Sequence, residues 1–269
     1  MKLGFIGGGN MAAAIIGGLI DKGFAAGDIT VAEPLEARRA WLVGEYGVAV
    51  EESAAACLRA DVIVLAVKPQ QLRQVLSGLP ALEARQLVLS VAAGVRAADI
   101  ARWLGGHGAV ARAMPNTPAL VGEGITGLFA LPGVGETQRD WADRVMAAVG
   151  GVVWVADETM IDAVTAISGS GPAYVFYFIE ALEQAGIELG LPPETARRLS
   201  LQTFLGAATL AVRDAAPPAE LRARVTSKGG TTERGLLALE QAGVKAAIAQ
   251  AARAAAARAA EMGELFGKD

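Results

Sequence analysis

A short stretch near the end of the chain gathers residue types that bind anions. The segment VTSKGGTTERGL (225–236) places hydroxyls, a lysine and two glycines within the seven positions from Thr226 to Thr232. Lysine and threonine beside glycine are typical of phosphate-binding loops, but the Walker order GxxxxGK[ST] is absent, because Lys228 precedes the glycines. The loop is followed by a predicted helix, whose first N–H groups attract anions. These residues alone leave the identity of the anion open.

A second stretch, at the start of the chain, has the spacing of a dinucleotide-binding turn. KLGFIGGGNMAAAI is read as a strand, a glycine turn and a helix over 10–22, with Gly7, Gly9 and Ala12 in the order GxGxxA. The first glycine permits the tight turn, the second admits a pyrophosphate close to the backbone, and the small third residue lets the helix pack against the strand. A glycine-rich turn in some other α/β protein is the alternative interpretation.

Glu33 lies at the end of the expected strand 28–33, where the adenosine ribose would lie. A carboxylate there accepts hydrogen bonds from the ribose 2′-OH and repels a 2′-phosphate, which favours NAD. Arg38 and Arg39, on the next helix, could reach a 2′-phosphate instead, and a solvated turn residue is the other interpretation of Glu33. The residues leave the choice between NADH and NADPH open.

Three more strand ends carry polar or small residues. LAVKP (65–69) places Lys68 after a strand, SVAAGV (90–95) offers small residues where a nicotinamide ring would need room, and MPNTPA contains Asn116 and Thr117. Because ligands bind at the carboxyl ends of parallel strands, we expect these segments to form the rim of one cleft. Each taken singly is also ordinary turn chemistry, and Lys68 alone would be a solvated lysine.

The elements that must position these residues change in character near residue 160. Before it, short β-branched runs alternate with helical segments, which predicts an α/β fold with a Rossmann-like, doubly wound parallel sheet. After it only helices are expected, and Ser170 or Gly171 is predicted to cap the first of them, with Pro172 in its first turn. We therefore predict a dinucleotide-binding domain over 1–160 and an all-α domain over 161–269. The expected strands are 2–6, 28–33, 62–67, 86–91, 109–114, 124–130 and 151–155, and the expected later helices are 171–189, 193–213 and 229–266, the last in one piece or in two around Gly243.

Composition excludes several classes of function. The chain has 269 residues and a net charge of −4, which gives no electrostatic footprint for nucleic acid or an anionic membrane. Its apolar runs are shorter than a membrane span, and Cys57 alone allows no intramolecular disulfide, so we expect a soluble cytoplasmic protein with a buried structural thiol. We expect no metal site, and the one histidine, His107, is read as a surface-loop residue rather than a catalytic one.

Six motifs in order give the chain a resemblance to the pyrroline-5-carboxylate reductases. They are GFIGGGNMA, AVKP, AAGV, MPNTPA, DAVTAISGSGPAY and VTSKGGTTERGLLALE, and they extend over essentially the whole length. The resemblance implies reduction of Δ1-pyrroline-5-carboxylate, a cyclic imine carboxylate, to L-proline with NADPH or NADH, as the last step of proline biosynthesis. It also implies a homodimer with interlocking C-terminal helices, and further assembly into a decamer as a pentamer of dimers.

The resemblance also assigns roles to individual residues. Ser227 and the N–H groups of Gly230, Thr231 and Thr232 would hold the substrate carboxylate, and the Thr232 hydroxyl would lie near the imine nitrogen as the catalytic group. N-capping by Ser227 or Thr232 is the purely structural alternative. The expected cofactor-binding residues are Gly7, Gly8, Gly9, Asn10, Met11, Glu33, Ala66, Val67, Lys68, Pro69, Ala92, Ala93, Gly94 and Asn116.

Three positions depart from the family pattern. Lys228 stands where proline is common, and its side chain is expected to point to solvent. Ala215 stands where many members carry an acid, which puts an acidic contact to the substrate nitrogen in doubt. Glu33 replaces the small polar residue of members that prefer NADPH.

Two other functions are compatible with the same plan. One is another enzyme on this plan, a β-hydroxyacid dehydrogenase or an imine reductase. The dehydrogenase would need a catalytic lysine on the helix after the glycine-rich stretch, and PAYVFYFIEAL contains none, whereas reduction of an imine does not need this base. A non-catalytic dinucleotide-binding module would not need the complete TSKGGTT loop.

Overall fold

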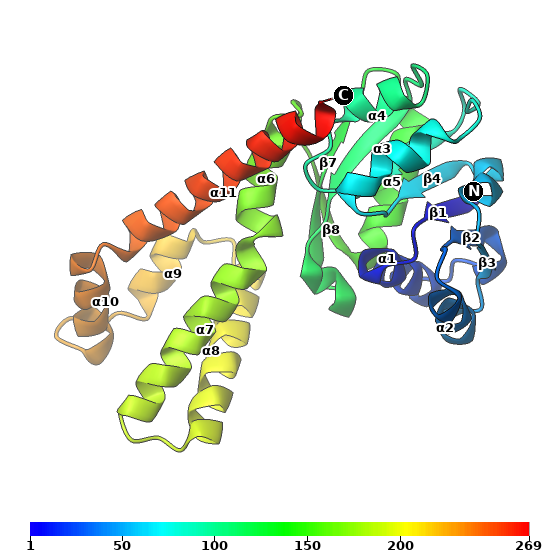
Figure 1. The fold of residues 1–269 in the computed structure, drawn as a ribbon. Helices are drawn as coiled ribbons and strands as arrows, with labels where there is room; N and C mark the ends of the chain where they lie inside the picture. The colour runs from blue at the N-terminus through cyan, green and yellow to red at the C-terminus, as the bar shows by residue number, and fades with distance from the viewer. Residues whose placement is uncertain (269) are drawn as a thin grey trace. The chain divides into compact units, whose positions relative to one another are not determined.

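The computed structural model describes residues 1–268, and Asp269, the last residue of the predicted helical domain, lies outside them. The chain forms two compact units (Figure 1). One unit contains Met1–Ser170 together with the chain from Ala254 onward, and the other is Gly171–Arg253. The C-terminal part of the last helix therefore belongs with the N-terminal unit.

The first unit is built on an eight-stranded sheet with the order β3-β2-β1-β4-β5-β6-β7-β8. All neighbouring strands are parallel except β6 and β7. The carboxyl ends of β1, β4, β5 and β6 therefore meet at one edge, which is where an open α/β sheet binds its ligands. The strands are β1 (Leu3–Ile6), β2 (Ile29–Ala32), β3 (Ala49–Glu51), β4 (Val62–Leu65), β5 (Leu87–Ser90), β6 (Val110–Met114), β7 (Gly124–Ala130) and β8 (Gly150–Trp154).

Two apolar layers, one on each face of the sheet, make up the core. In β4, Val62 and Val64 pack into one layer and Ile63 and Leu65 into the other, as the alternation of side chains along a strand requires. The first layer is completed by α1 (Asn10–Asp21), α2 (Glu36–Tyr46) and α5 (Glu136–Met146), and the second by α3 (Pro69–Ser77) and α4 (Ala97–Trp103). Helices on both faces confirm the predicted doubly wound α/β class.

Sequence analysis did not predict one short strand, and it gave the wrong direction for another. All seven expected strands are present, but β3 is an additional edge strand of three residues, paired with β2. The expectation of a wholly parallel sheet was wrong at β7, which runs antiparallel to β6, with Ala111 opposite Ala130 and Met114 opposite Gly127. The link between β6 and β7 is a short 3₁₀ turn over Thr117–Val121, which is too short for the crossover that a parallel pair needs.

The second unit is entirely helical among its described residues. The two predicted long helices are α7 (Gly171–Glu188) and α8 (Pro193–Arg213), and the expected segment 229–266 is divided at Gly243, whose φ is +70°, into α10 (Thr231–Gln241) and α11 (Val244–Gly267). The short helix α9 (Pro218–Arg224) was not predicted. Phe176 and Tyr177 on α7 are 65% and 69% exposed, so these two rings are not part of a core.

The predicted cap at Ser170 or Gly171 was wrong. Helix α6 (Met160–Val164) continues through one π-helical turn (Thr165–Gly169), and Ser170 itself has helical dihedral angles. The Ser168 hydroxyl donates to the Val164 carbonyl at 2.9 Å, so it bonds back into the preceding turn instead of capping the next helix. The glycine- and serine-rich stretch thus widens a helix rather than starting one.

Residues 1–268 contain neither a candidate membrane span nor a candidate metal cluster. No helix there is long and apolar enough to cross a membrane. No group of three or more His, Cys, Asp or Glu side chains in the same range is arranged to hold a metal ion.

Burial of Cys57 gives the first testable prediction. Its thiol donates to the Phe5 carbonyl at 3.3 Å, and burial raises the pKa of the thiol from 9.0 to about 12. The unfolded chain therefore loses this proton at a lower pH than the folded chain, so the associated stability is complete below pH 9 and is lost as the pH rises toward 12.

Between those pH values the free energy of unfolding should fall by about 1.4 kcal/mol per pH unit more steeply in the wild type than in Cys57→Ala. Urea unfolding of both proteins at pH 9, 10 and 11 measures the two slopes, and parallel slopes would contradict the assignment.

Candidate active site

The glycine turn after β1 is shaped by contacts that exclude side chains. Gly7 has φ +100°, and a Cβ there would lie 2.7 Å from the carbonyl oxygen of Ala66. Its N–H donates to the Ala32 carbonyl at 2.9 Å. Gly9, the N-cap residue of α1, has open space where its Cβ would be. The turn is therefore tight at Gly7 and open at Gly9, beside the free N–H groups of the first turn of α1, as a bound pyrophosphate requires.

Glu33 is buried and bonded to the backbone of this turn. One carboxylate oxygen accepts the Gly8 N–H at 2.9 Å and the other accepts the Leu35 N–H at 3.0 Å. Its exposed fraction is 8%, so the solvated-turn interpretation of Glu33 was wrong. Each oxygen retains a lone pair for a further donor such as a ribose hydroxyl.

Two arginines surround the same turn. The Arg38 Nε donates to the Gly8 carbonyl at 2.6 Å, and its guanidinium lies 4.0 Å from the centre of the Trp41 ring. Its Nη2 is buried and has no hydrogen-bond partner. Arg39 donates instead to the carbonyls of Glu33 and Pro34. Arg38 thus has a free donor beside the turn, while Arg39 supports the backbone after β2.

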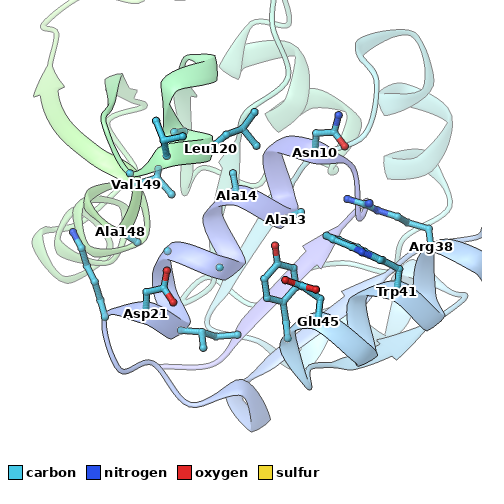
Figure 2. A pocket seen from close by; sticks show the side chains of 18 residues that line it. Asn10, Ala13, Ala14, Asp21, Arg38, Trp41, Glu45, Leu120, Ala148 and Val149 are labelled. Atoms are coloured by element: carbon cyan, nitrogen blue, oxygen red, sulfur yellow. The ribbon is translucent and has the colours of Figure 1, made fainter. Parts of the chain in front are cut away.

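A pocket of about 860 Å³ extends along α1 from its N-terminus (Figure 2). Figure 2 shows Asn10 at one end of it, with Arg38 and Trp41 facing it from α2. Among the residues predicted to bind the cofactor, only Asn10 lines this pocket. The pocket therefore borders the glycine turn, and the remaining candidates lie along the carboxyl edge of the sheet.

The other strand-end candidates follow neighbouring strands. Ala66 and Val67 follow β4 directly, with Ala66 against the glycine turn, and Pro69 is the first residue of α3. The Lys68 side chain is exposed. After β5, Ala92 and Ala93 lead into a turn in which Gly94 has φ +75°. The structure thus brings the segments 7–11, 66–69 and 92–94 to one edge of the sheet.

Asn116, which follows β6, has a structural contact as well. Its exposed fraction is 8%, and its side-chain oxygen accepts the Ile125 N–H at 2.9 Å, so it joins the 3₁₀ turn to β7. Thr117 beside it is exposed. His107 lies apart from these segments, where its Nε2 lies 2.9 Å from the Gln86 carbonyl oxygen.

The second group of candidates forms the turn between α9 and α10. Gly230 is the N-cap of α10, and no side chain caps this helix, so the structural alternative, N-capping by Ser227 or Thr232, was wrong. The carboxylate of Glu233 accepts the Gly229 N–H at 2.8 Å instead. The side chains of Ser227, Thr231 and Thr232 are exposed.

The Gly230 N–H, predicted to hold the substrate carboxylate, has a partner within the turn. It donates to the Ser227 carbonyl at 3.0 Å, so this donor is already used inside the turn. A Cβ at Gly230 would lie 2.5 Å from the Ser227 Oγ, so glycine here gives the Ser227 hydroxyl its room. The N–H groups of Thr231 and Thr232, in the first turn of α10, have no partner within the helix.

The structure also shows the surroundings of two positions that depart from the family pattern. Lys228 is exposed, as expected. Ala215 is exposed, and the acid beside it, Asp214, is bonded to Arg224 at 2.7 Å and to the Ala216 N–H at 2.9 Å. Asp214 is thus committed to local structure and does not replace the acid that Ala215 lacks.

Sequence reasoning missed a set of charged contacts around the turn after β5. Arg96 forms a two-point ion pair with Asp162, and Arg112, on β6, pairs with Glu158 at 2.8 Å. Glu158 also accepts the N–H of Ala97 at 2.6 Å. Burial lowers the pKa of Arg112, and the hydrogen bond and charge of Glu158 oppose that shift. The only sequence signal was an arginine inside a buried strand, which requires a carboxylate partner.

Family models match both parts of the chain. Residues 158–262 match the model described as pyrroline-5-carboxylate reductase dimerisation, and residues 2–94 match the model described as NADP oxidoreductase, coenzyme F420-dependent. The first match covers the helical unit and supports a homo-oligomer. The second covers the glycine turn and the segment that ends at Gly94.

Curated relatives and solved structures match over nearly the whole length. A pyrroline-5-carboxylate reductase of Pseudomonas aeruginosa is 47% identical over 99% of this chain and 98% of its own length, and one of Synechocystis is 46% identical over 98% and 99%.

The structure of a pyrroline-5-carboxylate reductase from Coxiella burnetii has a TM-score of 0.92, 41% identity and coverage of 97% of this chain and 98% of its own. A Plasmodium falciparum pyrroline carboxylate reductase with NADP bound has a TM-score of 0.86, 30% identity and 98% coverage of both chains. A reductive aminase from Aspergillus terreus, at 19% identity and a TM-score of 0.59, shares the fold alone. With this identity over its whole length, the chain belongs to the pyrroline-5-carboxylate reductase family.

Proposed function

We propose that this protein reduces Δ1-pyrroline-5-carboxylate to L-proline with NADPH or NADH, as the last step of proline biosynthesis. The observation that carries the proposal is the turn 227–232, which presents exposed hydroxyls and free helix-start N–H groups, in a chain with full-length relatives of that name. Such a turn suits a small carboxylate. We further propose that residues 1–160 bind the dinucleotide and that residues 161–269 bind the substrate and form the dimer contacts.

The carboxyl edge of the sheet suits a nicotinamide dinucleotide. The tight Gly7, the open Gly9 and the free N–H groups of α1 suit a pyrophosphate, and the small residues after β5 leave room for a flat ring. We propose that Glu33 accepts the ribose 2′-OH, because its carboxylate is held at the end of β2. The full proposed set is Gly7, Gly8, Gly9, Asn10, Met11, Glu33, Ala66, Val67, Lys68, Pro69, Ala92, Ala93, Gly94 and Asn116.

The proposed substrate contacts come from the start of α10. The Ser227 hydroxyl and the N–H groups of Thr231 and Thr232 hold the carboxylate, and the partial positive charge of the helix N-terminus adds to the attraction. Gly230 contributes room for Ser227 rather than a donor. Binding at this end also fixes the ring, so that its C5 carbon faces one direction.

The chemistry requires little beyond orientation. NAD(P)H, when bound, supplies the hydride. A protonated imine is electrophilic at C5, so the protein must hold two rings at reacting distance and keep a proton on the nitrogen. We propose that the Thr232 hydroxyl orients the imine nitrogen or donates a proton to it. Its side chain is exposed and caps no helix, so it is free for this contact.

Two alternative functions can be distinguished from a reductase. A β-hydroxyacid dehydrogenase would need a lysine on α7, and Gly171–Glu188 contains none. A binding module would bind dinucleotide without turnover. Titration of the purified protein with NADPH, with and without pyrroline-5-carboxylate, separates these, and binding without formation of L-proline would exclude the reductase.

The helical unit supports assembly of several copies. Large apolar side chains on α8 remain exposed in the single chain, with Leu205 at 62% and Val212 at 87%. We propose a dimer through interlocking helices of this unit and a further pentamer of dimers, in the cytoplasm. The mass of the native assembly, measured by light scattering, distinguishes a dimer from a decamer.

Gly9→Val tests the position of the pyrophosphate. Because a Cβ at Gly9 meets nothing within 4 Å, the variant should fold normally, while its side chain occupies the pyrophosphate space. Cofactor affinity measured by calorimetry should fall by at least about 100-fold, as a steric block of an essential contact implies. Gly27→Val is the matched control, because Gly27 also has open space and lies away from the turn. Retained affinity in Gly9→Val would refute the placement.

Thr232→Ala tests the catalytic hydroxyl. We expect kcat to fall by about 100-fold, the lower end for a positioned proton donor, while the Kd of the cofactor stays unchanged. Thr232→Ser, which keeps the hydroxyl, should recover most of the rate. A Thr232→Ala enzyme with wild-type kcat would remove the proposed role.

Glu33→Ser tests the selection of the cofactor. Removal of the carboxylate should raise the ratio of kcat/KM for NADPH over NADH by about 10-fold, because a charge repulsion disappears and the Arg38 donor remains. Glu33→Gln removes the charge while keeping the shape of the side chain and an acceptor for one of its two backbone N–H partners. An unchanged ratio in both variants would show that Glu33 does not contact the ribose.

A further inference from the structure

The last two turns of α11 lie against the turn after β5. A Cβ at Gly94 would be 2.9 Å from the Met262 Cβ and 3.3 Å from the Phe266 Cδ2, so the helix contacts the backbone of this turn directly. Phe266 also packs on the apolar layer that contains Ala92 and Val95. The helix side chains thus fill the space beside Gly94.

Other contacts fix the helix in this place. Gly263 is buried, and a Cβ there would lie 2.6 Å from the Arg96 Nε, so the guanidinium rests on the helix backbone. The same guanidinium is held by Asp162, at 2.7 Å and 3.2 Å. Arg102 on α4 donates to the Gly267 carbonyl at 2.9 Å. The turn after β5 is therefore held between α6, α4 and the end of α11.

From these contacts we infer that Met262 and Phe266 are positioning residues for hydride transfer, because they fix the 92–94 turn against which the nicotinamide ring rests. The inference rests on the proposed function, since it takes 92–94 as the ring contact. Both side chains contact this turn at Gly94. They act through Gly94, whose φ of +75° and missing side chain allow the close approach.

The physical effect follows from the geometry of the contact. Truncation of Met262 opens a space behind Gly94, into which the turn can relax away from the ring. The pyrophosphate contacts at Gly7–Asn10 lie on another strand end and remain, so cofactor affinity should change little. The distance and angle of hydride transfer should change, and small misplacements there reduce rates strongly.

Met262→Ala tests the inference. We expect kcat to fall by about 10-fold, and the primary isotope effect with C4-deuterated cofactor to rise, while the Kd of NADPH changes by less than about 2-fold. Met262→Leu, which refills the space, should restore kcat. If Met262→Ala does not fold, Phe266→Leu probes the same contact and should show the same pattern to a smaller extent.

Two controls separate positioning from loss of stability. Met146→Ala removes the same side chain from a fully buried site on α5 that is not in contact with the turn, so it should lower Tm without changing the isotope effect. Leu265→Ala truncates an exposed residue of α11 and should change neither Tm nor the isotope effect. If Met262→Ala kept the wild-type kcat and isotope effect, or if Met146→Ala changed kcat and the isotope effect to the same extent, the inference would be overturned. The proposed function would stand in either case. A wild-type protein that forms no L-proline would overturn the proposed function and the inference with it.

Discussion

The close approach of two backbones at Gly7 is the constraint on which the candidate site depends. The turn after β1 passes so near the end of β4 that a Cβ on Gly7 would lie 2.7 Å from the Ala66 carbonyl oxygen. Parallel pairing of β1 with β4, and of β4 with β5, then carries this alignment along the edge of the sheet. The free N–H groups of α1, the segment 66–69 and the turn 92–94 lie on that edge as a result. A side chain at position 7 would displace the first of these from the others.

In both candidate loops, nearby side chains and backbone groups form hydrogen bonds with the polar groups of the turn. At Gly8, the Glu33 carboxylate accepts the N–H and the Arg38 guanidinium donates to the carbonyl. At the start of α10, Glu233 accepts the Gly229 N–H and the turn closes with a bond to the Ser227 carbonyl. Each turn is therefore held in shape by its neighbours, and the N–H groups of the following helix remain for the ligand. Preorganisation of this kind lowers the entropy lost on binding.

Sequence predicted what local pattern encodes, and missed what depends on partners distant in the chain. The glycine turn and the seven strands have strong periodic or spacing signals, and all are present. The edge strand Ala49–Glu51 was missed because three residues are too few for a visible alternation, and the direction of β7 because alternation is the same for parallel and antiparallel strands. Burial of Glu33 and the contact of Met262 with Gly94 arise only from tertiary packing, which no spacing in the sequence reveals.

The helical unit has a different basis of stability from the sheet unit. Among its described residues, α7, α9 and α10 contain no buried side chain, and α8 buries only Ala196 and Ser200. Helices with so few buried side chains gain little free energy from burial within one chain, and the match to the dimerisation model supports a homo-oligomer that would bury more of them. The turn 227–232 belongs to this unit. Association of subunits through these helices would therefore also stabilise the turn that they flank.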